Sequence, residues 1–132
     1  LLIKLLKGIL KRYPNIEPIN IMGHSDIAPS RKVDPGPTFP WRRLYEEGLG
    51  IWYDLDDYKL FVKRLTNNPP TIYDMQRKLG DLGYKIEVTG IEDLKSQLVV
   101  RAFQMRFRDG AYSGFLDLET SAIISALHKK YK

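Results

Sequence analysis

The sequence predicts a mostly helical chain made of two units, of which the first holds one short strand and a long loop and the second is an all-α three-helix unit. Three observations lead to this prediction. Apolar residues recur at helical spacing at the start of the chain and in three segments after residue 70. One short apolar run, 19–23, stands apart from them. The stretch Thr66–Pro70 is polar and rigidified by two prolines, so we expect domains at 1–66 and 67–132.

The composition of the chain limits the classes of function that it can have. The chain has 132 residues, 43% of them hydrophobic, and 21 basic against 16 acidic side chains give a net charge of +5. The excess is divided almost evenly, +3 in 1–66 and +2 in 67–132, so no basic patch indicates a nucleic-acid partner. No apolar run is long enough for a transmembrane segment. The absence of cysteine excludes disulfides and a Cys nucleophile.

The first element is a predicted helix that ends before Pro14. Its apolar residues follow helical spacing and alternate with three lysines. Because Lys4 and Lys7 interrupt the apolar stretch and no small-residue cleavage site follows, we do not expect a signal peptide. A helix packed on the core is the preferred interpretation, and a basic helix lying on a membrane surface is the alternative. Since the chain starts at Leu1 inside an apolar helix, we expect an upstream part to be missing.

The rest of the first unit follows in order. The apolar run 19–23 predicts a buried strand. The segment His24–Pro40 contains four prolines and is expected to be a long loop. Pro40 and Gly50 bracket a short helix over 41–49. A second helix is expected over 54–65, with acidic residues in its first turn and basic ones in its last.

Three helices are predicted in the second unit, over 72–82, 94–108 and 118–131, each with one apolar stripe. Gly83 follows the first of them and suits a helix C-terminus that needs positive φ. Asp117 precedes the last helix and can cap it, with Thr120 at the third helical position.

The long loop holds the residues with chemical potential. A neutral His24 nitrogen and an Asp34 carboxylate oxygen are both good zinc ligands. Catalytic zinc takes three protein ligands, however, and two residues at this spacing are also consistent with a hydrogen-bonded loop pair. From the residues alone, a solvated loop cation is the preferred interpretation of Lys32, and Arg31 and Asp26 are expected to pair within the loop.

The string from Gly23 to Trp41, GHSDIAPSRKVDPGPTFPW, closely resembles the zinc-dependent N-acetylmuramoyl-L-alanine amidases of the AmpD/AmiD type, and the AmiD branch most. The resemblance implies an α/β amidase domain, a mixed sheet with flanking helices, of which only the C-terminal part is present here. It also implies that His24 and Asp34 are zinc (Zn2+) ligands. Lys32 would then be the catalytic lysine that stabilises the oxyanion of the tetrahedral intermediate.

The family pattern also includes a third zinc-binding His and a catalytic Glu, both upstream of the first helix here. His128 is the only other histidine of the chain, and its place near a helix C-terminus is explained by the helix dipole. Glu17 is in the wrong place for the base. We therefore expect this chain to carry half of the active site.

The second unit is similar to the three-helix peptidoglycan-binding domain found beside many wall hydrolases. The resemblance is carried by Gln76, Leu79, Leu82-Gly83-Tyr84, Gly90, Phe103-Gln104, Gly114, Asp117 and Thr120. Tyr84 and Tyr112 are candidate sugar-stacking aromatics, with packing at the domain edge as the alternative.

These observations predict a peptidoglycan hydrolase that cleaves the amide between (anhydro-)N-acetylmuramic acid and L-alanine by zinc-activated water. The alternative is a peptidoglycan-binding fragment without catalytic activity. Peptidoglycan or muropeptides are the expected partners, and nucleic acid is not. A wall-binding unit is useful only where intact wall exists, so the expected location is the periplasm, the outer membrane or the outside of the cell.

Overall fold

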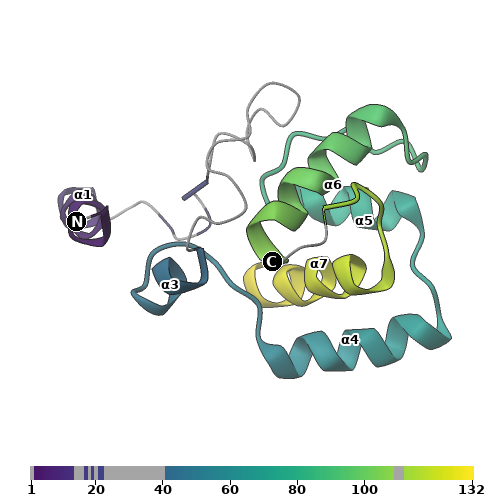
Figure 1. The fold of residues 1–132 in the computed structure, drawn as a ribbon, viewed down its shortest axis with the longest axis horizontal. Coiled ribbons are helices and arrows are strands. Elements are labelled where there is room, and N and C mark those ends of the chain that lie inside the picture. The colour runs from purple at the N-terminus through teal and green to yellow at the C-terminus, as the bar shows by residue number, and fades with distance from the viewer. Residues whose placement is uncertain (1, 14–16, 18, 20, 23–40, 109–111) are drawn as a thin grey trace.

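A computed structural model describes residues 2–13, 17, 19, 21–22, 41–108 and 112–132. Within these ranges the regular structure is helical and contains no strand. The helices are α1 (Leu2–Arg12), α3 (Trp41–Glu46), α4 (Leu55–Asn67), α5 (Ile72–Asp81), α6 (Leu94–Phe107) and α7 (Leu118–Tyr131). Figure 1 shows α4, α5, α6 and α7 gathered together, with α1 and α3 to one side.

α1 forms where the apolar spacing predicts it and lies on α3. Its buried face places Ile3, Leu6 and Leu10 against a small cluster of buried residues, Trp41, Leu44 and Leu49. An exposed ion pair of 2.7 Å from Lys7 Nζ to Glu47 Oε2 also joins α1 to the residue after α3. The packed-helix interpretation of α1 is therefore confirmed. Among the described residues, no helix has the length and apolar composition needed to cross a bilayer.

The strand predicted over 19–23 is wrong for the residues that can be described there. Ile19 and Met22 pack on the core formed by α5, α6 and α7, and Ile21 packs on the Trp41 cluster. A strand needs a neighbour that satisfies its backbone hydrogen bonds. No strand lies beside this segment in the described part of the chain, so its apolar side chains serve as packing residues only.

α3 is shorter than the predicted helix 41–49 because the chain reverses at Gly48. The Gly48 amide donates to the Tyr45 carbonyl at 2.8 Å, and the Leu49 amide donates to the Leu44 carbonyl at 2.8 Å. This pair of bonds is a Schellman motif, which requires a left-handed residue at its turn. Gly48 provides it with φ +79°.

The three predicted helices after residue 70 are present as α5, α6 and α7. We call residues 71–131 the helical unit. Its core is formed by side chains that are fully buried between the helices, among them Leu79, Phe103 and Ile124. Each helix begins at a capping side chain: Thr71, Asp93 and Asp117 accept a hydrogen bond from the backbone amide three residues on.

The helical unit also contacts chain that precedes the predicted boundary at Thr66–Pro70. α4 packs along α7 (Figure 1). Ile51 belongs to the same buried core as the residues of α5, α6 and α7. The packing of the chain therefore crosses residues 66–70, and a division into domains at 1–66 and 67–132 stays a prediction.

Candidate functional site

The residues proposed for chemistry lie outside the described residues. His24, Lys32 and Asp34 fall within 23–40, which we call the candidate segment. In the described part of the chain, no group of three or more His, Cys, Asp or Glu side chains could hold a metal ion. The structure does describe the residues on either side of the candidate segment, Met22 and Trp41, and both lie against the helical unit.

Met22, the residue before the candidate segment, packs at the C-terminus of α5. The amides of Gly83 and Tyr84 donate to the carbonyls of Gly80 and Leu79, both at 3.0 Å, which closes α5 with a Schellman motif. Gly83 has φ +105°, which confirms the predicted C-terminal role. A Cβ built on Gly83 would lie 3.6 Å from the Met22 sulfur, so Met22 packs directly over this turn.

Trp41, the residue after the candidate segment, packs at the C-terminus of α6. The Arg106 Cζ lies 3.9 Å from the centroid of the Trp41 ring and 5.2 Å from that of Phe107. Trp41 and Arg106 are both only 6% exposed. A guanidinium over an indole face is attracted by the ring quadrupole, and the attraction grows when water is excluded. The first residue of α3 is thereby held on the helical unit.

The far end of α3 is held by the last turn of α7. Lys130 Nζ donates to the Tyr45 hydroxyl at 2.7 Å, to the Trp52 carbonyl at 3.2 Å and to Asp54 Oδ1 at 2.9 Å. Burial alone would lower the pKa of Lys130, but the hydrogen bonds to Tyr45 and Asp54 outweigh it and raise the pKa above its usual value. The ammonium therefore stays charged over the physiological range. The Tyr131 hydroxyl adds a bond to the Trp52 carbonyl at 3.3 Å.

A cavity of about 660 Å³ opens beside this contact. It is lined by aromatic, acidic and basic side chains, among them Tyr45, Trp52, Asp54 and Arg42.

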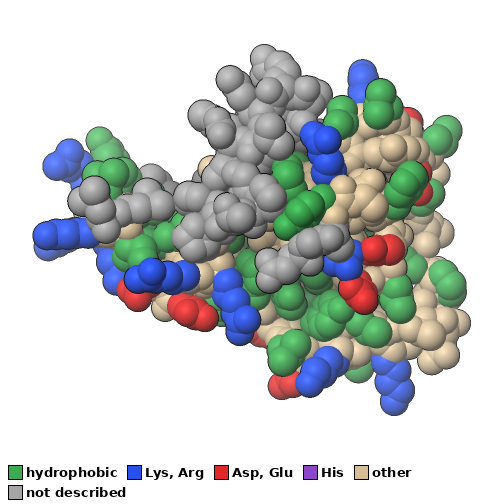
Figure 2. All heavy atoms as spheres, in the orientation of Figure 1, with side chains coloured by type: hydrophobic (Ala, Val, Ile, Leu, Met, Phe, Trp, Pro, Cys, Tyr) green, Lys and Arg blue, Asp and Glu red, His purple; other side chains and the backbone are tan. Residues whose placement is uncertain are grey.

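On the face shown in Figure 2, Lys and Arg side chains are interspersed with Asp and Glu and form no continuous basic stripe.

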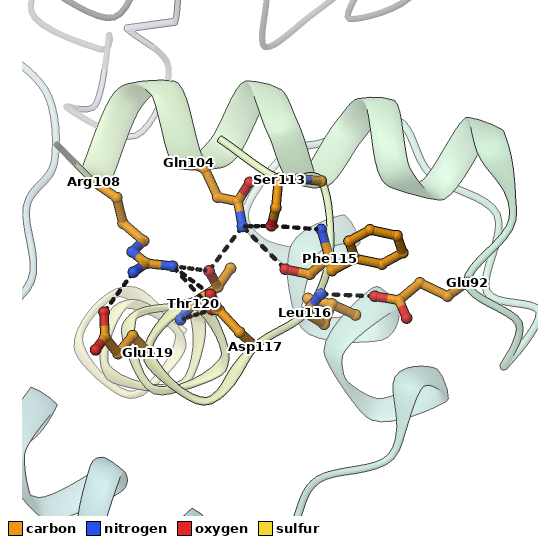
Figure 3. Close-up of polar contacts among 10 residues, drawn as sticks. Glu92, Gln104, Arg108, Ser113, Phe115, Leu116, Asp117, Glu119 and Thr120 are labelled. Carbon is orange, nitrogen blue, oxygen red and sulfur yellow. Dashed lines mark hydrogen bonds and ion pairs between the residues drawn. The ribbon is translucent and has the colours of Figure 1, made fainter. Parts of the chain in front are cut away.

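Two buried glutamines explain most of the residue pattern in the helical unit. Gln104 accepts a hydrogen bond from the Gly114 amide at 2.8 Å and donates to the Phe115 carbonyl and the Thr120 hydroxyl, both at 3.0 Å (Figure 3). Gln76 accepts from the Gly90 amide at 2.8 Å and donates to the Ile91 carbonyl at 2.9 Å. Each side chain thus fixes the loop that follows its helix.

The two glutamines hold an internal repeat that the sequence reasoning missed. The segments Thr89–Ser96 and Ser113–Thr120 read TGIEDLKS and SGFLDLET, with Gly, Asp and Leu at matching positions. The Asp of each copy caps a helix, Asp93 for α6 and Asp117 for α7. The repeat could have been found by aligning the chain with itself. These residues shape the fold through their caps and loop hydrogen bonds.

Arg108 contacts several side chains of the second copy of the repeat. It donates to Asp117 Oδ2 at 2.7 Å and to the Thr120 hydroxyl at 3.0 Å, and it pairs with Glu119 (Figure 3). Burial alone would raise the pKa of Asp117, but hydrogen bonds from Thr120 and Arg108 outweigh it and hold the pKa below its usual value.

Of the two alternatives for Tyr84, sugar stacking and packing, the structure supports packing. Tyr84 is 5% exposed, and its ring meets the Phe103 ring edge-on with centroids 5.8 Å apart, so its face is part of the core. Tyr112 is partly buried and its role stays a prediction.

His128 Nε2 lies 2.8 Å from Asp81 Oδ2. This contact links α7 to α5 and lowers the pKa of Asp81.

Comparison with known proteins bears on the resemblance carried by Gly23–Trp41. The chain is 40% identical over 131 residues to the N-acetylmuramoyl-L-alanine amidase AmiD of Escherichia coli strain K12, covering 98% of this chain and 47% of AmiD. It is similar to the crystal structure of AmpDH3 from Pseudomonas aeruginosa in complex with anhydromuramic pentapeptide, with a TM-score of 0.92 and 44% identity over 98% of this chain and 51% of that one. No protein-family model matches the chain.

A further solved structure is AmiD from E. coli in complex with the substrate anhydro-N-acetylmuramic acid-L-Ala-D-gamma-Glu-L-Lys, with a TM-score of 0.84 and 37% identity over 98% of this chain and 50% of that one. The chain is therefore a homologue of the AmiD and AmpD N-acetylmuramoyl-L-alanine amidases, which confirms the resemblance. It spans about half the length of AmiD and of the two solved chains.

Proposed function

We propose that the protein carrying this chain is a zinc-dependent N-acetylmuramoyl-L-alanine amidase that acts on peptidoglycan or its muropeptides. The similarity to AmiD over 98% of the chain is the observation that carries the proposal. In the reaction, water adds to the lactyl carbonyl of the muramic acid and the carbon–nitrogen bond breaks. The sugar keeps a carboxylate, and the peptide leaves with a free L-alanine amine that takes up a proton.

The metal proposal rests on donor chemistry. An imidazole nitrogen of His24 and a carboxylate oxygen of Asp34 are ligands that zinc prefers, so the residue types fit. Bound zinc lowers the pKa of a water molecule to about 7 and polarises a carbonyl. A third His ligand and a general-base Glu are implied by the resemblance, and neither is assigned to a residue of this chain.

Lys32 is the proposed oxyanion-stabilising residue. Lys32 stands two positions before Asp34 in the sequence, in a stretch rich in prolines. A cation near the carbonyl oxygen interacts more strongly as negative charge develops there, so it lowers the barrier more than it strengthens substrate binding.

For the rest of the protein we propose the layout expected from the sequence. Residues 1–66 are the C-terminal part of the α/β amidase domain, and residues 67–132 are a peptidoglycan-binding-like three-helix domain. Such a pair of domains acts on intact wall, so we propose that the protein works in the periplasm, at the outer membrane or after secretion.

The alternative function is peptidoglycan binding without catalysis by this chain. Its support is that two zinc ligands are one fewer than a catalytic site requires. Sedimentation of residues 1–132 with purified sacculi tests it directly. Binding together with an absence of hydrolysis by this chain would support the alternative for the isolated chain, and no binding would contradict it.

The amidase proposal is tested with the protein at its full natural length. Incubation with an anhydromuramyl peptide should release a peptide with a free L-alanine amine, detected by mass spectrometry. His24→Ala should lose the metal, measured as zinc per chain after dialysis. Lys32→Ala should keep the metal and lower kcat by about 10²–10³. Arg31→Ala, a neighbouring loop cation, is the matched control and should leave kcat unchanged.

Three outcomes would contradict these assignments. Intact substrate with the zinc-loaded wild-type protein would reject the amidase activity. Full zinc occupancy of His24→Ala would reject the ligand assignment. A wild-type rate for Lys32→Ala would remove Lys32 from the mechanism.

A further inference from the structure

We infer that Arg106 and Lys130 are positioning residues for the proposed amidase. Both belong to the helical unit, and their side chains contact the two ends of α3, Arg106 at Trp41 and Lys130 at Tyr45. α3 begins at the residue directly after the candidate segment, so its position sets where that segment must end. The inference rests on the proposed function, because its consequence is the rate of that reaction.

α3 needs support from outside itself. It is 6 residues long, which is too short for a helix to be stable on its own in water. Its local core consists of Trp41, Leu44 and Leu49, with residues of α1, Ile21 and Trp52 packed on them. The place of α3 is therefore set by tertiary contacts, and those from α6 and α7 fall at its two ends.

The first contact joins Arg106 to Trp41. The Arg106 Cζ lies 3.9 Å from the centroid of the indole ring, and both side chains are nearly excluded from water. The space beside it is limited, because a Cβ built on Gly50 would lie 3.5 Å from Arg106 Nη2. A planar guanidinium can stack on a ring while an ammonium cannot, so lysine is a poor substitute here.

The second contact joins Lys130 to the other end of α3. Its ammonium meets the Tyr45 hydroxyl at 2.7 Å and lies 4.6 Å from the centroid of the same ring. The neighbouring Lys129 pairs instead with Asp57 of α4 at 2.8 Å. Two adjacent lysines of one helix thus have separate partners, and only Lys130 touches α3.

The consequence for the proposed reaction follows from chain connectivity. Trp41 comes seven residues after Asp34 and nine after Lys32. Met22, at the other end of the candidate segment, also packs on the helical unit, over Gly83. If α3 lost its contacts with the helical unit, the candidate segment would remain anchored through Met22 but no longer through Trp41. A misplacement of about 1 Å in a catalytic group can lower a rate by about 10²-fold.

The position of α3 can be measured in the 132-residue chain by tryptophan fluorescence. The chain has 2 tryptophans, and both lie at this contact: Trp41 under Arg106, and Trp52 with its carbonyl on Lys130. Arg106→Met and Lys130→Met should shift the emission to longer wavelength and increase quenching by acrylamide. Tyr45→Phe removes only the hydroxyl and tests the Lys130 contact without deleting a charge.

The matched controls are Lys95→Met on α6 and Lys129→Met on α7, which remove a cation from the same helices without touching α3. They should keep the wild-type emission, and circular dichroism should show unchanged helix content in all variants. Wild-type emission and quenching in both Arg106→Met and Lys130→Met would overturn the inference that these residues hold α3.

The catalytic consequence is measured with the protein at its full natural length. In Arg106→Met and Lys130→Met we expect kcat to fall about tenfold or more, with KM changed less than about twofold and zinc per chain unchanged. Arg106→Lys should recover little of the lost rate. A residue that supports only folding would lower the melting temperature and leave kcat per folded molecule unchanged, and this result would overturn the positioning role.

The two proposals fail in different ways. If the wild-type protein hydrolyses no muropeptide, the proposed function is wrong, while the fluorescence result on α3 stands by itself. If the wild-type protein is active and Arg106→Met and Lys130→Met are equally active, the amidase proposal stands and the positioning role is wrong.

Discussion

The helical unit and the part of the chain formed by α1 and α3 are stabilised in different ways. In the helical unit, each helix begins at a side-chain cap, and two fully buried glutamines fix the loops between the helices. Around α3 the local core is three buried residues. Its ends are held by Arg106 and Lys130, which come from the helical unit. The part that follows the candidate segment directly in the sequence therefore depends on contacts with the part farther along the chain.

This difference suggests a reason for the C-terminal helices that does not require them to bind the wall. A compact, capped bundle can serve as a rigid support for a loop-rich site, and binding and catalytic residues are often carried by loops on such scaffolds. If the support is essential, weakening the helical unit should release the α3 part as well. The opposite change, weakening α3, should leave the helical unit folded.

The largest expected effect is that of Gln104→Leu. The substitution leaves the buried Gly114 amide and the partly buried Phe115 carbonyl without their side-chain partner. Such unsatisfied groups cost about 1–3 kcal/mol each, so we expect the free energy of unfolding to fall by about 3 kcal/mol. Urea unfolding followed by circular dichroism measures it. Gln97→Leu on the same helix is the control, and an equal loss there would contradict the role of Gln104.

A smaller effect is expected at the turn that Met22 packs over. Gly83→Ala places a Cβ on a residue with φ +105°, which should lower the free energy of unfolding by about 1–2 kcal/mol. Gly80→Ala is the control with the opposite sign, because its added Cβ meets only Ile86 at 3.9 Å, an ordinary contact. Alanine inside a helix stabilises by about 0.5–1 kcal/mol relative to glycine. If both variants were equally stable, the turn would not need glycine.

The smallest expected effect is a loss of stability at acidic pH. Because the folded pKa of Asp117 is held below its usual value, its contribution to stability is fully present above the unfolded pKa, about 3.9, and is lost as pH falls through the folded pKa. Denaturant midpoints should therefore fall from pH 5 to about pH 2, and Asp117→Asn should weaken this dependence.

Glu47→Gln is the matched control for the acid experiment. The hydrogen bond and charge of Lys7 lower the pKa of Glu47, but the pair is exposed, and exposed pairs contribute little to stability. We expect the pH dependence of Glu47→Gln to match that of the wild-type chain. A dependence unchanged by Asp117→Asn would contradict the assignment to Asp117.

Local sequence signals predicted the helical unit well. The apolar spacing gave the three helices within one residue of their bounds, and Asp117 and Gly83 were recognised as the start of one helix and the end of another. These signals are local, because caps and turns depend on backbone geometry within a few residues. The strand over 19–23 failed because a strand needs a distant partner, which no local pattern specifies.

The candidate site also has a part that the sequence predicted and a part that it could not predict. His24, Lys32 and Asp34 were recognised from a contiguous string of residues, and their arrangement lies outside the described part of the chain. The contacts that hold α3 could not have been predicted, because Arg106 lies 65 positions from Trp41 and Lys130 lies 85 positions from Tyr45. From the sequence alone, Arg106 and Lys130 look like ordinary surface cations. The internal repeat, by contrast, was visible in the sequence and was missed.

The central claim is that the helical unit holds α3, and native-state amide hydrogen exchange of the 132-residue chain tests it most directly. The opening free energy of α3 amides should approach that of α6 in the wild-type chain, because held elements open together. In Arg106→Met the α3 value should fall while the α6 value stays, and in Lys95→Met neither should change. Low protection of α3 in the wild-type chain, unchanged by Arg106→Met, would contradict the claim.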